Sequence, residues 1–301
     1  MSMLPAPYIR ADRSTASVMT AVCVALVPPS VAAIYVFGIQ AALRLTIGVL
    51  TACAADRLSG FRSAFDGSAA VTGWILTLSC PVGTPLWLLM LGPLFAVFVM
   101  RDAFGGIGNN LFNPAMAARA VMLALFPAQL TGYTTTDALS SATPLATVNA
   151  ALTWENLLPR LIGTTGGSMG ETSALMIVLG AVWLLARRII RWQMPILSLL
   201  GFSIVSLLTT GHILLPLLSG SILFGVVYIF TDYTGKPTTP LGEGMFALGI
   251  GITVALLRAY GRYPEGVCFA VLLWNLLTPL IERLTAPRIY GRKPYGRKQR
   301  I

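Results

Sequence analysis

The sequence contains few charged side chains for its length. Only 11% of its 301 residues are Asp, Glu, Lys or Arg, and 55% are hydrophobic, whereas about 25% of the residues in an ordinary soluble domain are charged. Apolar stretches of near-membrane length recur from end to end. This composition excludes a water-soluble globule and predicts an all-α polytopic membrane protein, because helices satisfy their own backbone hydrogen bonds in lipid.

Histidine and cysteine are also scarce. His212 is the single histidine, and Cys23, Cys53, Cys80 and Cys268 stand apart in apolar segments without a C-x-x-C pair. Structural zinc sites and iron–sulfur clusters use closely spaced thiolates. The sequence therefore predicts no metal site in this chain. We interpret the cysteines as packing residues and His212 as a turn residue between two helices.

The apolar stretches predict about ten transmembrane helices. We place them near 16–38, 39–56, 67–83, 84–100, 111–127, 172–187, 194–211, 212–231, 244–261 and 265–283. Five helices on each side of the hydrophilic segment 128–171 imply two inverted five-helix halves. We expect one membrane domain over 1–301, composed of the first helices (1–127), the loop (128–171), the second helices (172–284) and a basic tail (285–301).

The net charge of +10 raises the question of a nucleic-acid partner. The basic residues lie between apolar stretches and in the tail, and do not form one soluble face. When the N-terminus starts in the cytoplasm, most of them fall on the cytoplasmic side. The pattern thus predicts two cytoplasmic termini, an extracytoplasmic loop 128–171, contact of the tail with anionic lipid, and no nucleic-acid partner.

The loop contains an exposed-looking octapeptide, Asp137-Ala138-Leu139-Ser140-Ser141-Ala142-Thr143-Pro144. Its small residues leave the backbone accessible, and Pro144 biases Thr143 towards an extended conformation that presents the hydroxyl. On its own, the octapeptide is more typical of a Ser/Thr turn followed by a proline at a helix start.

The octapeptide resembles the D-x-x-S-x-A-T-P flavinylation signal of a family formed by the D subunit of the Rnf complex and the B subunit of the sodium-pumping NADH:quinone oxidoreductase. Ser141 stands where such signals often have glycine. Further segments resemble the same family in the same order: Gly105-Gly106-Ile107-Gly108-Asn109-Asn110-Leu111-Phe112-Asn113-Pro114-Ala115, Gly166-Gly167-Ser168-Met169-Gly170-Glu171-Thr172, Thr231-Asp232 and Tyr263-Pro264-Glu265-Gly266. The length of the chain favours the D subunit.

The resemblance implies a function in electron transfer. In the family, a flavin transferase joins FMN through its phosphate to the threonine that maps onto Thr143. The Rnf complex of the bacterial inner membrane, in which A, B, C, E and G subunits accompany the D subunit, couples electron transfer between ferredoxin and NAD to Na⁺ or H⁺ movement. This chain is then expected to relay electrons through covalent FMN, with no catalytic residue and no complete active site of its own.

The segment from Gly105 to Pro114 offers three amides, at Asn109, Asn110 and Asn113, among glycines that permit close backbone approach. The resemblance maps a second, non-covalent flavin (riboflavin or FMN) onto Asn110 and Asn113. The alternative is that these asparagines cap the helix that begins near Pro114.

Two charged residues lie within or beside the apolar stretches, where charge is costly. We interpret Arg119 as a structural residue of the fifth helix, and Glu171 as a cap at the start of the sixth. A competing hypothesis for the whole chain is a cofactor-free solute channel or transporter, since two inverted halves are also a transporter-like plan.

Overall fold

The structure of the protein is a computed structural model. It describes residues 14–60, 66–131, 158, 161, 163, 167–218, 221–261 and 266–287. The longer helices are α1 Thr15–Phe37, α2 Ile39–Leu58, α3 Ser68–Leu78, α4 Leu86–Phe95, α5 Pro114–Leu125, α8 Ala174–Ala186, α9 Gln193–Thr210, α12 Pro240–Tyr260 and α13 Val267–Thr285. The short elements are η1 Ala96–Arg101, η2 Asp102–Phe104, α6 Pro127–Thr131, η4 Met169–Glu171, α10 Leu214–Leu218, α11 Ile222–Phe224 and η5 Gly225–Ile229.

The prediction of an all-α polytopic membrane protein is confirmed. Helical segments occur in each of the expected places, and within the described residues six helices are long and apolar enough to cross a membrane. One of these runs continuously from Leu86 through the π-helical η1 to Phe104. Three further apolar helices, α3, α5 and α8, are shorter than was expected.

Proline and glycine explain where the expected helices are shortened or broken. The third expected helix, 67–83, already ends at Leu78, ahead of Pro81 and Pro85. The eighth, 212–231, is divided into α10, which ends at Leu218, and a second piece that begins at Ile222 and continues as the π-helix η5. Hydropathy detects such apolar segments, but it does not show whether the helix is continuous.

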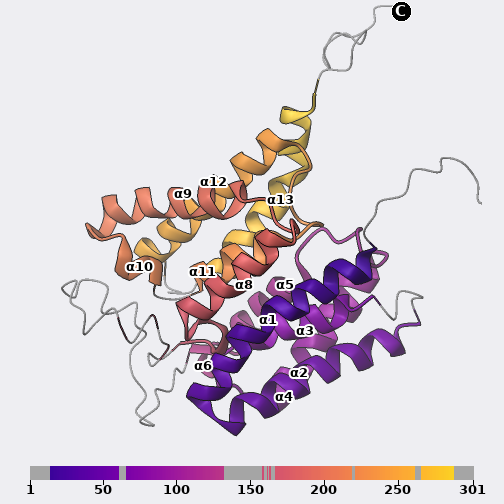
Figure 1. Ribbon diagram of the computed structural model, residues 1–301. Helices are drawn as coiled ribbons and strands as arrows, with labels where there is room; N and C mark the ends of the chain where they lie inside the picture. The colour runs from indigo at the N-terminus through magenta and orange to yellow at the C-terminus, as the bar shows by residue number, and fades with distance from the viewer. Residues whose placement is uncertain are drawn as a thin grey trace, which may run out of the picture.

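Figure 1 shows α1 to α5 gathered on one side of the molecule and α9, α10, α12 and α13 on the other, with α8 lying along α1. The pair α9 and α12 is packed closely. A Cβ atom on Gly251 would collide with the Ser198 carbonyl oxygen, and one on Gly201 would lie 2.6 Å from that of Leu248. Small residues thus bring these two helix backbones together, as is usual between membrane helices.

The end of the expected loop 128–171 is part of the packed interior. Ser168 and Met169 are fully buried. Met169 N donates to Cys80 O at 3.1 Å, and Ser168 forms an isolated antiparallel bridge with Pro81. This short stretch therefore anchors the loop to the turn that follows α3.

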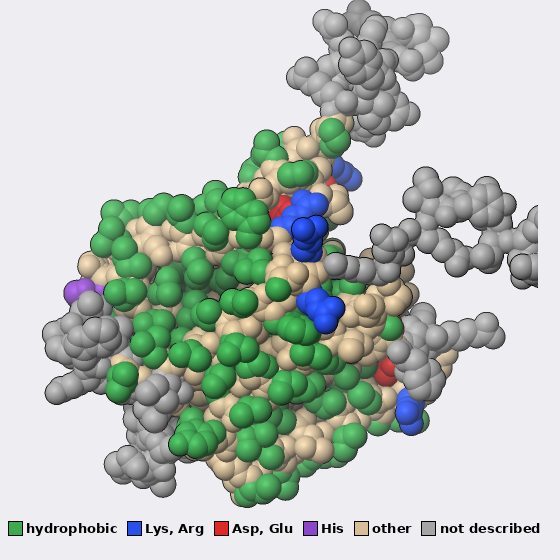
Figure 2. Space-filling view, in the orientation of Figure 1, with side chains coloured by type: hydrophobic (Ala, Val, Ile, Leu, Met, Phe, Trp, Pro, Cys, Tyr) green, Lys and Arg blue, Asp and Glu red, His purple; other side chains and the backbone are tan. Residues whose placement is uncertain are grey.

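The outer surface is strongly apolar. Figure 2 shows hydrophobic side chains spread over the face formed by α1 and α8, with a few basic side chains beside them. Exposed valines on these helices include Val27, Val31, Val178 and Val182, each between 45% and 58% exposed. A water-facing surface rarely carries so much contiguous apolar area, so this face is suited to lipid.

Candidate functional site

The octapeptide that carries the flavinylation signal, 137–144, lies outside the described residues. Its flanks are described: α6 ends at Thr131, and the chain is again anchored at Ser168 and Met169. FMN attachment at Thr143 therefore stays a prediction. A second candidate site, at the start of α5, lies within the described residues.

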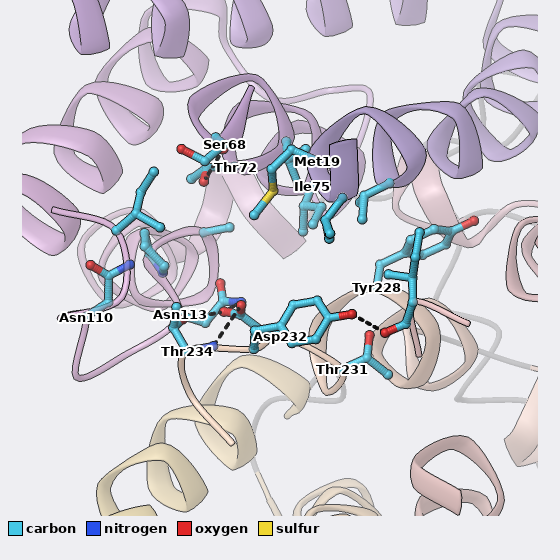
Figure 3. A pocket seen from close by; sticks show the side chains of 18 of the residues that line it. Met19, Ser68, Thr72, Ile75, Asn110, Asn113, Tyr228, Thr231, Asp232 and Thr234 are labelled. Atoms are coloured by element: carbon cyan, nitrogen blue, oxygen red, sulfur yellow. Dashed lines mark hydrogen bonds between the residues drawn. The ribbon is translucent and has the colours of Figure 1, made fainter. Parts of the chain in front are cut away.

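A narrow cavity lies where the ends of several helices meet. It is bounded by the starts of α1, α3 and α5 and by the ends of α8 and η5, and its volume with the open mouth included is about 810 Å³. Figure 3 shows Met19, Ser68, Thr72 and Ile75 along one wall and Asn113, Asp232 and Thr234 along the other.

These segment ends are the ones that the charge pattern assigned to a single side of the membrane. The expected topology placed the starts of the first, third and fifth helices and the ends of the fourth, sixth and eighth on the same face, and the cavity is lined by residues from all six. The alternating path of the chain is consistent with this grouping. That this face is cytoplasmic stays a prediction from the positive-inside rule.

Asn113 caps a helix, which is one of the two roles expected for it. It is the N-cap of α5: its Oδ1 accepts from Met116 N at 3.1 Å, and Pro114 follows at the first helical position. Its Nδ2 donates to Asp232 Oδ2 at 2.9 Å. Because both polar atoms are engaged inside the protein, Asn113 shapes the wall of the cavity and has one remaining amide hydrogen for a ligand.

Asn110 is in a different position. It lines the cavity, and its Oδ1 is buried with no hydrogen-bond partner among the described residues. A buried acceptor without a partner costs about 1–3 kcal/mol. The two asparagines therefore differ in role: Asn113 is hydrogen-bonded within the protein, whereas Asn110 presents an unused acceptor oxygen to the cavity. Asn109, the third amide, is exposed and donates to Gly105 O at 3.3 Å.

Asp232 is the central acceptor of the wall opposite α3. Besides Asn113, Thr234 donates to it twice, from Oγ1 to Oδ2 at 3.2 Å and from N to Oδ1 at 3.4 Å. Burial raises the pKa of the Asp232 carboxyl above its ordinary value, and the hydrogen bonds from Thr234 and Asn113 offset only part of this effect. The group lies beyond η5, outside the membrane-spanning helices.

Asn275 of α13 also belongs to this wall, where it joins Asn113 to Gly235. With its amide oriented to satisfy the surrounding groups, Oδ1 accepts from Asn113 N at 2.9 Å and Nδ2 donates to Gly235 O at 3.1 Å. Asn275 is 3% exposed. Nothing in the sequence indicated this residue, because its significance depends on which helices are in contact.

Arg101, the last residue of η1, is a buried basic residue. Its side chain is 2% exposed and forms ion pairs with Asp56 and, at 2.7 Å, with Asp102. Nη1 also donates to Ser68 Oγ at 3.2 Å. The guanidinium lies beside the cavity, but its charge is already balanced by two carboxylates.

The lining of the cavity suits a flat, mostly apolar ligand with a polar edge. The enclosed volume is about 100 Å³, below the range of about 300–1,000 Å³ that is typical of small-molecule sites, so a ring system requires the walls to move apart. Aliphatic side chains such as Val22, Val71 and Ile75 supply faces against which a ring can pack. Asn110 Oδ1 is an acceptor for a ring N–H group. An isoalloxazine ring has this combination of a large apolar surface and one amide-like edge.

Glu171 does not cap α8, contrary to expectation. It ends the 3₁₀ turn η4, and the N-cap of α8 is Ser173, whose side chain accepts from Met176 N at 3.4 Å. The sequence placed the helix start at 172 and so selected the wrong polar residue. Arg119 is 4% exposed within α5, and His212 lies in the turn between α9 and α10, as expected.

Among the described residues, no group of three His, Cys, Asp or Glu side chains is arranged to hold a metal ion. Cys80 and Cys268 are buried, and Cys23 and Cys53 are half-buried. A second charge cluster lies outside the cavity, where Glu243 at the start of α12 pairs with Lys236 at 2.5 Å and with Arg191 at 3.1 Å. This cluster joins α12 to the two preceding loops.

Comparison with known proteins identifies extensive similarity. The sequence matches the NQR2, RnfD, RnfE family over residues 2–291. It is 38% identical to the D subunit of the Na(+)-translocating ferredoxin:NAD(+) oxidoreductase complex of Acetobacterium woodii, over 97% of this chain and 95% of that protein.

Two further relatives show the same near-complete overlap. The D subunit of the ion-translocating oxidoreductase complex of Stutzerimonas stutzeri is 37% identical over 93% of both chains. The D subunit of the proton-translocating ferredoxin:NAD(+) oxidoreductase complex of Clostridium ljungdahlii is 32% identical over 95% of this chain and 94% of its own length.

Proposed function

The chain belongs to the NQR2, RnfD, RnfE family, and on that premise we propose that it is the D subunit of an ion-translocating oxidoreductase complex and relays electrons through bound flavin. It is a membrane subunit of an enzyme complex, as its relatives are named. The electron transfer takes place between ferredoxin and NAD. One relative is named for Na⁺ and another for protons, so the names of the relatives do not identify which ion the complex of this chain transports.

The first proposed flavin is FMN, joined covalently to Thr143 through its phosphate. The support is the octapeptide from Asp137 to Pro144 together with the resemblance of the surrounding segments. A covalent bond suits a redox carrier because the flavin then remains beside its electron partners in every oxidation state. Thr143 supplies the point of attachment, and the flavin supplies the redox chemistry.

The second proposed flavin is non-covalent and would be held at the cavity between α3 and the 231–234 segment, whose walls would have to widen to admit it. Asn110 Oδ1 would accept a hydrogen bond from the ring, and Asn113, held by Asp232, would fix the wall beside it. Arg101 is the one basic residue in the lining, and it is already paired with two carboxylates. This favours riboflavin over FMN, because a phosphate would need an uncompensated positive charge.

The two proposed flavins belong to different faces in the topology that the charge pattern predicts. The cavity lies at the first residue of α5, on the face expected to be cytoplasmic, and Thr143 belongs to the loop 128–171 that is expected to be extracytoplasmic. With that topology, electrons would cross the membrane between the two flavins.

The attachment site is tested by producing the chain together with a flavin transferase and examining it on a denaturing gel. The wild type is expected to show in-gel flavin fluorescence and an intact mass larger by one FMN less the water lost in forming the ester, and Thr143→Ala is expected to show neither. Thr147→Ala, four residues further along the same segment, is the matched control and should keep the fluorescence.

The possible outcomes test the attachment residue and the covalent flavin separately. Fluorescence that survives in Thr143→Ala would show that the flavin is covalently bound at another residue. A wild-type chain with the mass of the bare polypeptide would overturn the covalent relay, and a cofactor-free channel or transporter would become the better hypothesis.

A further inference from the structure

The enclosed volume of the cavity at the start of α5 is about 100 Å³, which is too small for a ligand with several fused rings. Part of the lining must therefore move when such a ligand enters. The lining comes from helices α1, α3, α5 and α8, from the segment that precedes α5, and from the segment that follows η5. The bonds that hold the two segments indicate which of them can move.

The segment that follows η5, residues 231–236, is fixed along its length. Four of its residues form hydrogen bonds or ion pairs with other parts of the fold, in or beside α5, α8, α12 and α13. These pairs are Asp232 with Asn113, Tyr233 with Ile189, Gly235 with Thr278, and Lys236 with Glu243. Movement of this wall would break contacts with four helices or their ends at once.

The segment that precedes α5, residues 103–112, is held by fewer bonds, and we call it the glycine segment. Phe104 is 47% exposed and Leu111 is 39% exposed. Within the described ranges of the chain, the hydrogen bonds of the glycine segment remain inside the segment itself and the helix end before it. This segment can therefore move without breaking bonds to the rest of the fold.

The backbone of the glycine segment also has unusual freedom. Gly105, Gly106 and Gly108 have φ values between 88° and 103°, where L side chains rarely occur. The two ends of the segment are fixed, because Arg101 is paired with two buried carboxylates and Asn113 caps α5. Three freely rotating residues between two fixed points are the geometry of a hinged flap.

We propose that the glycine segment is the gate of the cavity, which moves outward to admit a ring system and returns against it. The inference rests on the proposed function, because the ligand is the non-covalent flavin. Asn110 lies on this segment, and its buried Oδ1 has no partner in the part of the chain that the structure describes. Figure 3 shows Asn110 on its own loop, apart from Asn113 and Asp232. The ring acceptor is thus carried by the gate.

The first test is hydrogen exchange of the full-length chain in lipid nanodiscs, produced without a flavin transferase and measured with and without riboflavin. Without riboflavin, the glycine segment is expected to exchange about tenfold faster than residues 231–236, since each anchoring bond slows opening by about this factor. Riboflavin is expected to slow exchange in the glycine segment alone. Equal exchange of the two segments, or slowing confined to 231–236, would overturn the proposal.

A variant tests the hinge. Gly108→Ala adds a methyl group that meets no atom within 4 Å, but it places an L residue at a φ of 93°. Because this strain belongs to the closed conformation, the gate opens more often and riboflavin is expected to enter about fivefold faster. Gly211→Ala, at the C-cap of α9 with a φ of 71° and equally open surroundings, is the matched control. It should keep the wild-type rate, measured by riboflavin fluorescence after rapid mixing.

The results distinguish the gate from the flavin. If the wild type binds no riboflavin, the non-covalent flavin and its gate both fail. If it binds riboflavin at a rate that Gly108→Ala leaves unchanged, only the gate fails. Weaker binding in Gly108→Ala without faster entry would also contradict the gate, because general loosening of the fold has that result.

Discussion

Asp232 accepts a hydrogen bond from Asn113 at 2.9 Å, although the two residues are separated by 119 positions in the sequence. Asn113 simultaneously caps α5, so this bond joins the first half of the chain to the segment that follows η5. Asp232 thus holds one wall of the cavity together with Asn275. Substitution of that carboxylate should change both the stability of the protein and its retention of a ligand.

Replacing Asp232 by alanine is expected to lower the free energy of unfolding by about 1–3 kcal/mol, because the Asn113 amide then loses its partner in a part-buried position. Asp232→Asn keeps an acceptor oxygen and should cost less. Unfolding of the detergent-solubilised protein measures the difference. Equal stability of the alanine variant and the wild type would show that Asn113 finds another partner.

The raised pKa of Asp232 predicts a pH dependence. Because the folded protein binds this proton more tightly than the unfolded chain, the stability that it contributes is fully present below the unfolded value of about 3.8. That contribution is lost as the pH rises through the folded pKa. Melting temperatures across this range should therefore fall more steeply in the wild type than in Asp232→Asn. Parallel curves would contradict the assignment of this titration to Asp232.

Removing Arg101 is expected to be among the most damaging single changes. Arg101→Met leaves the buried carboxylates of Asp56 and Asp102 without their cation and should cost about 3–5 kcal/mol of folding free energy. The triple variant that adds Asp56→Asn and Asp102→Asn removes all three charges and should cost less than Arg101→Met. A triple variant that is less stable than Arg101→Met would show that the cluster stabilises the fold by more than charge compensation.

Asn110→Ala is expected to reduce the retention of the non-covalent flavin while leaving the fold intact, because Oδ1 has no partner within the described protein. Loss of one hydrogen bond in a dry cavity corresponds to about 1 kcal/mol, or roughly fivefold in affinity. Flavin released on denaturation is compared with covalently held flavin in the same sample. Asn109→Ala is the control, since Asn109 is exposed.

An unchanged ratio of released to covalent flavin in Asn110→Ala would remove this residue from the proposed site. Absence of released flavin from the wild type would instead remove the second flavin, without any consequence for Thr143. The two proposals thus fail separately.

The positions of the helices could be predicted from the sequence, but whether each helix is continuous could not. Hydropathy depends on composition over a window, so it located the segment 212–231 but did not detect its division into α10 and the α11–η5 piece. It also placed the start of the sixth helix at 172, and for this reason Glu171 was assigned a capping role that Ser173 performs. Element boundaries depend on single side-chain hydrogen bonds, which a window average does not detect.

The sequence predicted the candidate cavity only in part. The three asparagines between 105 and 114 identified the right segment, because a cluster of glycines and amides just before a helix is a local pattern that a sequence shows directly. The difference between Asn110 and Asn113 depends on Asp232 and Asn275, which come from distant parts of the chain. The burial of Arg101 could not be predicted for the same reason, because it follows from the approach of Asp56 and Ser68.

The cavity has a thermodynamic consequence for biogenesis. Its lining is contributed by the ends of helices from both halves of the chain. A ligand that binds there, and only to the folded state, stabilises the association of the two halves in proportion to the logarithm of its free concentration. Loading of the cavity during assembly would thus favour the folded subunit over incompletely packed forms.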